Sequence, residues 1–445
     1  MNAPPAEWLP PLMAAGATVG WLALCWQAWR QHRARGVAEP STLQRLCVSY
    51  ASQGGEAKHI AERTAAWLCA AGVDASLCAL ERLNAKALPD TLLIVASTHG
   101  DGEAPDHAAS VLTHWRALAS HEAPSHHAVL ALGDNHYPHF CAFGHQLDAQ
   151  LTALGSRALW PLLAVNRLDN LLIQKWFQHL KTHFSLSNAS IPTAEQASAT
   201  RWRLVARTRL TPDATDAPLY WLALRPVTPT MPLQWRAGDT VALRLADFSA
   251  DEPARLYSIA SLPEEGHLAL VVRQHTRGRV SRWLCEQAAL GAEITLHERA
   301  NSTFQVSAEA RAPLLLIGNG SGMGCLRALL YEQAQRHQHG HWLLLGERYP
   351  FDNSIENDFR AWHDSGHLVR LEYVYSRAQP ERRYVQHALR EQAARVKQWM
   401  TNGGAIRVCG GQAMGCAVDM ALREILGAEC VQQLASAGRY RRDLF

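Results

Sequence analysis

Three loops in the first half of the chain carry residues that suit a phosphate group and a flat aromatic ring. The first loop is small and polar and leads into a predicted helix, so it suits a phosphate dianion; it comprises Ser52, Gln53, Gly54, Gly55, Glu56 and Ala57. The second lets backbone approach a ring and places a histidine to cover one face; its residues are Ser97, Thr98, His99, Gly100 and Gly102. The third offers a stacking tyrosine and contains Leu132, Gly133, Asp134, His136, Tyr137 and Phe140. Each loop alone is typical of an ordinary turn, but together they predict a ligand site.

These loops need strands that end side by side, and the pattern of apolar runs supplies them. Apolar runs alternate with helical patterns and predict a doubly wound α/β domain; the runs are 43–50, 91–97 and 128–132, and the helices 57–71, 144–154 and 171–183. Short strands follow at 201–210, 219–225, 240–245 and 267–273, as in an antiparallel β-barrel. Buried runs at 313–317, 342–346, 369–374 and 406–409 predict a second α/β domain.

With these elements in place, residues 43–445 resemble the diflavin reductase family, which includes cytochrome P450 reductase and the flavoprotein subunit of sulfite reductase. The three loops resemble the flavodoxin pattern that holds FMN, and the rest resembles the ferredoxin–NADP reductase module. The resemblance implies FAD, FMN and NADPH as cofactors. The predicted domains are an anchor and basic stop at 1–40, an FMN domain at 41–185, a linker at 186–199, an FAD-binding β-barrel at 200–309 and an NADP-binding domain at 310–445.

The resemblance also assigns residues to the FAD site. The segment RLYSIAS matches a flavin motif in which Arg255 contacts the FAD pyrophosphate, Tyr257 stacks on the flavin and Ser258 lies by its N5. A second pyrophosphate loop is matched by Gly278, Val280 and Ser281. The aromatic Phe445 is expected to cover the FAD ring. In relatives with this tail, residues at the positions of Ser258, Cys409 and Asp443 assist hydride transfer.

The NADP site is assigned in the same way. A glycine-rich turn after the strand PLLLI is expected to hold the NADP pyrophosphate through Gly318, Gly320, Ser321 and Gly322. A pocket for the 2′-phosphate is matched by Ser376, Arg377, Arg382, Tyr384 and Gln386. Arginines bind a phosphate dianion through charge-assisted, bidentate bonds, so NADPH is favoured over NADH.

The chain departs from the family at four places. It lacks the large helical insert before the RLYS motif. Gly54 and Glu56 replace the usual threonines of the phosphate loop, and Glu56 should weaken FMN binding unless it points away or bonds to a backbone N–H. Cys141 replaces a common Asn and His99 a common aromatic, while the last residue is Phe445 in place of Trp.

The N-terminus contains an uncharged run from Trp8 to Trp29, followed at once by Arg30, Arg33 and Arg35. The run is long enough to cross a bilayer as a helix, and the positive-inside rule places the body of the protein in the cytoplasm. We expect a single-pass anchor, in a bacterial inner membrane, with the N-terminus outside. A cleaved signal peptide and a buried helix are the alternatives, and the missing basic n-region and cleavage site disfavour the former.

Composition excludes several other classes of protein. A chain that is 48% hydrophobic and 19% charged is neither disordered nor collagen-like, and without a basic stripe no nucleic-acid partner is predicted. The ten cysteines form no CxxC pair, so zinc ribbons and common iron–sulfur spacings are not indicated, and no metal site is expected. The histidines at 337, 339 and 341 are interpreted as a solvated loop.

Charge divides unevenly between the two halves of the chain. Residues 41–185 hold 10 basic against 12 acidic side chains, and residues 186–445 hold 30 against 26, which favours docking of one half on the other. Asp101, Glu103, Asp106 and Asp134 are candidates to steer a basic acceptor, with solvated loop acids as the alternative.

The sequence therefore predicts a membrane-anchored, NADPH-dependent diflavin reductase. Electrons would pass from NADPH to FAD to FMN, and then to a one-electron acceptor such as a haem protein or a sulfite reductase-like partner. The alternatives are a ferric or ferric-siderophore reductase that acts on a small ferric chelate, and a tethered binding module with a degenerate FMN site.

Overall fold

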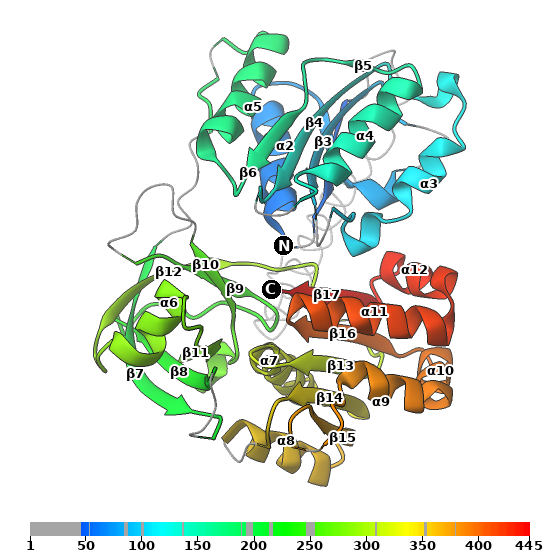
Figure 1. Ribbon diagram of the computed structural model, residues 1–445. Coiled ribbons are helices and arrows are strands. Elements are labelled where there is room, and N and C mark those ends of the chain that lie inside the picture. The colour runs from blue at the N-terminus through cyan, green and yellow to red at the C-terminus, as the bar shows by residue number, and fades with distance from the viewer. Residues whose placement is uncertain are drawn as a thin grey trace, which may run out of the picture. The chain divides into compact units, whose positions relative to one another are not determined.

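The structure, a computed structural model, describes residues 46–445 with short gaps (Figure 1). The gaps are at 53, 84–87, 99–101, 136–137, 188, 193–198, 213–216, 246–253, 308, 351–353 and 379. The predicted anchor at 8–29 and its basic stop lie outside the described residues. In the part of the chain that is described, no helix has both the length and the apolar character required to cross a bilayer.

The first sheet is parallel, with strand order β2-β1-β3-β4-β5 and β6 also paired to β4. Its strands are β1 (Leu46–Ala51), β2 (Ala75–Ala79), β3 (Thr91–Ser97), β4 (His126–Gly133), β5 (Arg157–Ala158) and β6 (Leu163–Asn166). Its helices are α2 (Glu56–Ala70), α3 (Val111–Arg116), α4 (Ala142–Ala153) and α5 (Asn170–His183), with short 3₁₀ turns at Leu80–Arg82, Asp106–Ala108 and Ser120–Glu122. Alternate side chains of β3 enter two apolar layers. Leu93 and Val95 pack with α2 and α5, and the intervening residues pack with α3 and α4, so the doubly wound prediction is confirmed.

The second sheet is antiparallel, with strand order β10-β9-β12-β7-β8-β11. Its strands are β7 (Thr200–Arg209), β8 (Leu219–Pro226), β9 (Thr240–Leu243), β10 (Arg255–Ser258), β11 (Leu268–Arg273) and β12 (Glu293–Arg299). A bridge between Ile259 and Leu270 joins its two edges, so the sheet curls back on itself. A 3₁₀ turn at Pro263–Glu265 and the short helix α6 (Arg279–Arg282), continued by a π-helical turn at Trp283–Gln287, complete this region.

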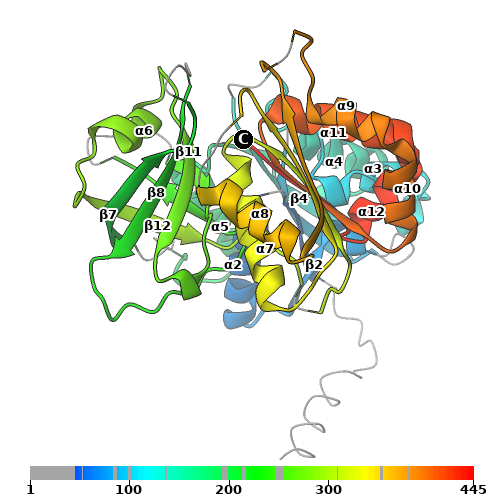
Figure 2. The ribbon, with the colours of Figure 1, turned by 90° about the horizontal axis from the view of Figure 1, so that it is seen from below.

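The third sheet is parallel, with strand order β15-β14-β13-β16-β17. Its strands are β13 (Leu314–Asn319), β14 (His341–Glu347), β15 (Leu368–Tyr375), β16 (Ala405–Gly410) and β17 (Tyr440–Leu444). Its helices are α7 (Gly322–Gln335), α8 (Ser354–Asp364), α9 (Val385–Glu391), α10 (Ala393–Thr401), α11 (Gln412–Leu426) and α12 (Ala428–Ser436). Helices α7 and α8 cover one face and α9–α12 the other (Figure 2). Residues Leu46–Phe445 pack as one compact unit.

Where predicted and observed elements overlap, their ends differ by a few residues at most, but the sequence analysis missed several strands. It did not predict β2, β5, β6, β10, β12 or the closing strand β17. The solvated-loop interpretation was wrong for His341, which opens β14 and is 1% exposed. The ring of His341 accepts a hydrogen bond from the backbone N–H of Leu314 and packs edge-on against His367, and burial lowers the pKa of His341 to about 4.

Candidate functional site

The predicted phosphate loop joins β1 to α2, and its geometry fits an anion. Gly55 caps the helix with φ +91°, a conformation that glycine adopts without strain, and the loop therefore turns sharply into Glu56 and Ala57. The side-chain oxygens of Ser52 and Thr98 are buried, and neither has a hydrogen-bond partner among the described residues. A buried hydroxyl without a partner is costly, so both oxygens are suited to a polar ligand at this edge of the sheet.

The three loops of the first sheet are tied together by hydrogen bonds. The hydroxyl of Ser97 donates to the carbonyl of Ala51 at 3.1 Å, and the N–H of Thr98 donates to the carbonyl of Leu132 at 2.9 Å. The structure therefore brings these loops to one edge, as the sequence predicted. The predicted residues Gln53, His99, Gly100, His136 and Tyr137 lie outside the described residues.

The rest of the second and third loops is closely packed. A Cβ at Gly102, whose φ is +96°, would lie 2.6 Å from the Cβ of His139, and one at Gly133 would lie 3.0 Å from the sulfur of Cys141. Phe140 is half-buried beside Gly133. The carboxylate of Asp134 pairs with Arg167 at 2.9 Å, so Asp134 is held within its own domain.

Glu56, the departure from the family pattern, lies over the start of its own helix. Its carboxylate accepts a hydrogen bond from its own backbone N–H, and Arg299 lies 3.6 Å from Oε1. A Cβ at Gly54 would lie 2.7 Å from Oε2 of the same carboxylate. The carboxylate therefore sits in the loop and takes a backbone N–H of the kind that a phosphate requires. Burial raises the pKa of Glu56.

The three residues predicted to assist hydride transfer come from two sheets and meet at one point. Ser258 ends β10, Cys409 is in β16, and the parallel register pairs Cys409 with Asp443 of β17. The hydroxyl of Ser258 donates to Oδ2 of Asp443 at 3.0 Å, and the thiol of Cys409 lies 3.9 Å from the same oxygen. Burial raises the pKa of Asp443 to about 6. A hydrogen bond with Cys325 and complete burial raise the pKa of the Cys409 thiol.

The remaining FAD-site predictions lie on β10, at the start of α6 and at the last residue of the chain. Arg255 is exposed and Tyr257 half-buried on β10, and burial raises the pKa of Tyr257. At the start of α6, the hydroxyl of Ser281 donates to the carbonyl of Gly278 at 3.3 Å, and Val280 is buried beneath them. Phe445 is 57% exposed and its backbone bonds to Gly410 at 3.1 Å, so the ring is available to cover a ligand.

The glycine-rich turn between β13 and α7 is built for close backbone approach. A Cβ at Gly322 would lie 2.1 Å from the carbonyl oxygen of Cys409, and one at Gly318 would lie 2.8 Å from the same atom. Gly320 has φ +56° and lies against the guanidinium of Arg273. A side chain at Gly318 or Gly322 would clash with the backbone of Cys409, and Ser321 occupies the N-cap position of the fourteen-residue helix α7. A pyrophosphate fits a helix N-terminus of this kind.

The segments predicted to bind the 2′-phosphate also meet. The N–H groups of Ser376 and Arg377 donate to the carbonyls of Glu347 and Arg348, each at 2.9 Å, at the carboxyl end of β14. Three predicted residues follow around the start of α9: Arg382, Tyr384 and Gln386, of which Arg382 and Tyr384 are exposed.

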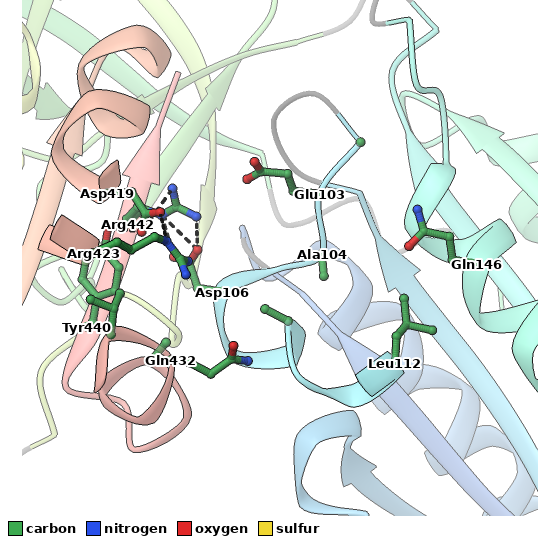
Figure 3. Close-up of a pocket in the computed structure, with 14 residues that line it drawn as sticks. Glu103, Ala104, Asp106, Leu112, Gln146, Asp419, Arg423, Gln432, Tyr440 and Arg442 are labelled. Atoms are coloured by element: carbon green, nitrogen blue, oxygen red, sulfur yellow. Dashed lines mark hydrogen bonds and ion pairs between the residues drawn. The ribbon is translucent and has the colours of Figure 1, made fainter. Parts of the chain in front are cut away.

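One ion pair joins the domains of the first and third sheets. The charge division predicted docking of the two halves but did not name this pair. The guanidinium of Arg442 forms a bidentate ion pair with Asp106, with Nε 2.9 Å from Oδ1 and 3.1 Å from Oδ2 (Figure 3). Both side chains are buried, at 6% and 3% exposed. Nearby, the hydroxyl of Tyr440 donates to Asp419 at 3.0 Å. The acid belongs to the acidic half and the arginine to the basic half, as the charge division favours.

This contact corrects the interpretation of Asp106 as a residue that steers an acceptor. Because Asp106 is buried against Arg442, its carboxylate does not face an approaching protein. Glu103 is exposed in the same loop and lines the pocket beside the ion pair (Figure 3). A further contact joins α2 to the segment that follows β12, because Lys58 donates to the hydroxyl of Ser302 at 2.8 Å.

Comparison with known proteins finds a family match and several relatives. Residues 48–176 match the flavodoxin family. The chain contains a flavodoxin domain. It is 29% identical over 453 residues to the sulfite reductase [NADPH] flavoprotein alpha-component of Thiocapsa roseopersicina, which covers 88% of this chain and 85% of that protein. The corresponding protein of Shewanella oneidensis is 24% identical over 591 residues and covers 100% of this chain and 96% of that protein. That of Vibrio cholerae is 26% identical over 550 residues, with 93% and 90% covered.

The chain is thus homologous over nearly its full length to flavoprotein alpha-components, and the prediction of a flavoprotein reductase is confirmed. The alignment with Shewanella oneidensis runs over 591 residues although this chain has 445, so that relative carries insertions that this chain lacks. In the structure, β9 ends at Leu243 and pairs directly with β10, which begins at Arg255. Only eleven residues, 244–254, connect the two strands, which is too few for a large helical insert.

Proposed function

We propose that the chain is an NADPH-dependent diflavin reductase, with FAD and FMN as cofactors, that passes electrons from NADPH to a one-electron acceptor. The observation that carries the proposal is the meeting of Ser258, Cys409 and Asp443 beside a glycine-rich dinucleotide turn, in a chain homologous to flavoprotein reductases over its length. When bound, FAD takes up the two electrons of a hydride and FMN passes them on one at a time.

The residues of the chain position and protect this chemistry. Asp443 accepts the hydrogen bond of Ser258, which fixes the orientation of the hydroxyl beside the predicted flavin site. Cys409 packs its thiol against the same carboxylate in a fully buried position, so water is kept from that side. Ser52 and Thr98 present unsatisfied oxygens at the FMN site, which favours a functional site over a degenerate one.

Flavin extraction from the full-length protein tests the proposal. We expect one FAD and one FMN per chain, together with loss of flavin absorbance on addition of NADPH. FAD alone would overturn the two-flavin relay, and flavins that NADPH does not reduce would overturn the reductase.

Arg377→Ala is expected to lower the preference for NADPH over NADH by about 10- to 100-fold, the range of one or two charge-assisted bonds to the 2′-phosphate. The measurement is kcat/KM for both nucleotides. Arg390→Ala removes an arginine of α9 that pairs with Glu424, and it should leave the preference unchanged. The same preference for NADPH over NADH in wild type and Arg377→Ala would show that Arg377 does not bind the 2′-phosphate.

Glu56→Thr is expected to tighten FMN binding by about tenfold, because it frees a backbone N–H and removes a carboxylate from the phosphate loop. The dissociation constant is measured by quenching of FMN fluorescence on the flavin-stripped, full-length protein. Glu62→Thr, on the same helix but away from the loop, is the control. Unchanged or weaker binding in Glu56→Thr would show that the carboxylate does not compete with the phosphate.

The proposed acceptor is a haem protein, such as a sulfite reductase-like partner, or another membrane-bound carrier. Two arguments support it: the names of the relatives, and the proposed anchor at Trp8–Trp29, which would confine the flavodoxin domain to a membrane surface.

The anchor is tested by membrane fractionation. Full-length protein should remain in the membrane fraction after an alkaline wash. A chain with Leu22→Arg and Leu24→Arg should be released, and release of the wild type would overturn the anchor.

A further inference from the structure

A third ligand-bearing side chain lies against the hydride-transfer residues. Cys325, in the first turn of α7, is fully buried, and its sulfur lies close to the thiol of Cys409. The sulfur atoms of Cys325 and Cys409 and a carboxylate oxygen of Asp443 all lie within 4.8 Å of one another. Among the described residues, no other three histidine, cysteine or acidic side chains gather this closely.

The spacing of these atoms suits a small, soft cation. Zinc binds thiolate sulfur at about 2.3 Å and carboxylate oxygen at about 2.1 Å, so the two ligands of a tetrahedral site lie about 3.6 Å apart. The observed distance from the sulfur of Cys409 to Oδ2 of Asp443 is 3.9 Å. The three elements that carry the ligands are fixed by the sheet and by the tight turn at Gly322, so little movement is needed to close around an ion.

Other buried cysteines of the chain have a simpler explanation. The thiol of Cys141 donates to the carbonyl of Ala131 at 3.3 Å, and Cys285 packs inside an apolar cluster, so each acts as a small apolar side chain. Cys325 and Cys409 differ, because each faces a second sulfur and a carboxylate. Two thiolates and a carboxylate are a ligand set typical of zinc or cadmium.

We propose that Cys325, Cys409 and Asp443 form a binding site for a soft divalent cation, such as Zn²⁺ or Cd²⁺, and that the bound ion inhibits the enzyme. Two metal–sulfur bonds and one metal–oxygen bond form, the two thiol protons leave to solvent, and no electron moves. The hydroxyl of Ser258, 3.0 Å from Asp443, or a water molecule completes the tetrahedron. The inhibition rests on the proposed function, while the binding does not.

The inhibition follows from the ligands that the ion takes. A metal bound to Oδ2 of Asp443 competes with the hydrogen bond from Ser258, and a metal bound to Cys409 holds its sulfur away from the flavin side. Reduction of the flavin by NADPH would therefore stop, although both flavins would stay bound. A chelator should restore the rate.

Cadmium titration of the flavin-loaded, full-length protein tests the site. We expect thiolate-to-cadmium charge-transfer absorbance that saturates at one ion per chain and disappears on addition of a chelator. Cys325→Ser should weaken this binding by at least tenfold, whereas Cys416→Ser, which changes an exposed cysteine of α11, should match wild type. Equal cadmium absorbance in wild type and Cys325→Ser would overturn the site. Cys325→Ala provides a second variant if the serine disturbs folding, as judged by circular dichroism.

A second measurement separates the site from the proposed function. The rate of flavin reduction by NADPH is followed with and without Zn²⁺, and each variant is compared with its own metal-free rate. We expect Zn²⁺ to inhibit wild type and Cys416→Ser alike. Inhibition of Cys325→Ser should require at least tenfold more Zn²⁺. Binding without inhibition would overturn the inhibitory role. A chain without an NADPH-reducible flavin would overturn the proposed function, while the cadmium absorbance would still decide the site.

Discussion

Asp443→Asn is expected to slow reduction of the flavin by NADPH by about 100-fold, within the range of a positioned acid–base group. The carboxylate accepts a hydrogen bond from the hydroxyl of Ser258 and lies beside the thiol of Cys409. An amide in its place carries no negative charge to interact with these two groups. The measurement is the rate of flavin absorbance loss after rapid mixing with NADPH. KM for NADPH should change little, because Asp443 is not among the residues predicted to bind the pyrophosphate or the 2′-phosphate.

The pH dependence of the same step gives a second, independent test. Since burial raises the pKa of Asp443 to about 6, its carboxylate is protonated below that pH and ionised above it. Ser258 donates to the ionised form, so the reduction rate should fall as pH falls through about 6 in wild type. In Asp443→Asn this fall should be absent.

The raised pKa also predicts the effect on stability. Protonated Asp443 favours the folded state, and this contribution is lost as pH rises from the ordinary aspartate pKa of 3.8 through about 6. Asp443→Asn should therefore not lower the melting temperature above pH 6.

A wild-type rate of flavin reduction in Asp443→Asn would show that Asp443 does not assist hydride transfer. Asp364→Asn, at an exposed site, controls for the loss of one charge.

Asp106→Ala is expected to reduce the docked population of the flavodoxin domain by at least about 100-fold. Removing one partner of a buried ion pair costs about 3–5 kcal/mol, because the other charge remains buried without its partner. Arg442 would be left in that position. Transfer between the two flavins requires docking, so the second phase of flavin reduction should slow, while the first phase, reduction by NADPH, should change only a few-fold.

Glu103→Ala is the matched control for this prediction. Glu103 belongs to the same loop, carries the same charge and lines the same pocket, but it is exposed (Figure 3). It should leave both phases of reduction near wild type, since exposed charges contribute little. Equal slowing in both variants would indicate a general effect of loop charge, and no slowing in Asp106→Ala would show that the ion pair does not hold the docked state.

The sequence predicted the interior of the fold better than its connections. Continuous apolar runs such as Thr91–Ser97 have only one stable place, in the middle of a parallel sheet covered on both faces, and that strand was predicted with its observed bounds. The strand Tyr440–Leu444 was missed because its sequence, YRRDL, is mostly charged. Arg442 is buried because its partner, Asp106, lies in another part of the chain, and no local pattern contains that information.

The site could be predicted as separate motifs but not as one arrangement. Ser258, Cys409 and Asp443 were assigned through resemblance, and sheet register then places them within hydrogen-bonding reach. Cys325 carried no signal, because a single cysteine after a glycine-rich turn is unremarkable in sequence. The position of the Glu56 carboxylate was likewise open, since its direction depends on Arg299, more than two hundred residues away.

Strand β17 has a mechanical consequence for electron flow. Arg442 and Asp443 are neighbours on an edge strand, so their side chains point to opposite faces: one reaches the flavodoxin domain and the other the hydride site. A slip of one residue against β16 would move Asp443 away from Cys409 and turn Arg442 away from Asp106 in the same event. Entry of electrons from the nucleotide and their onward transfer would then fail together. Both steps therefore depend on the register of this one strand.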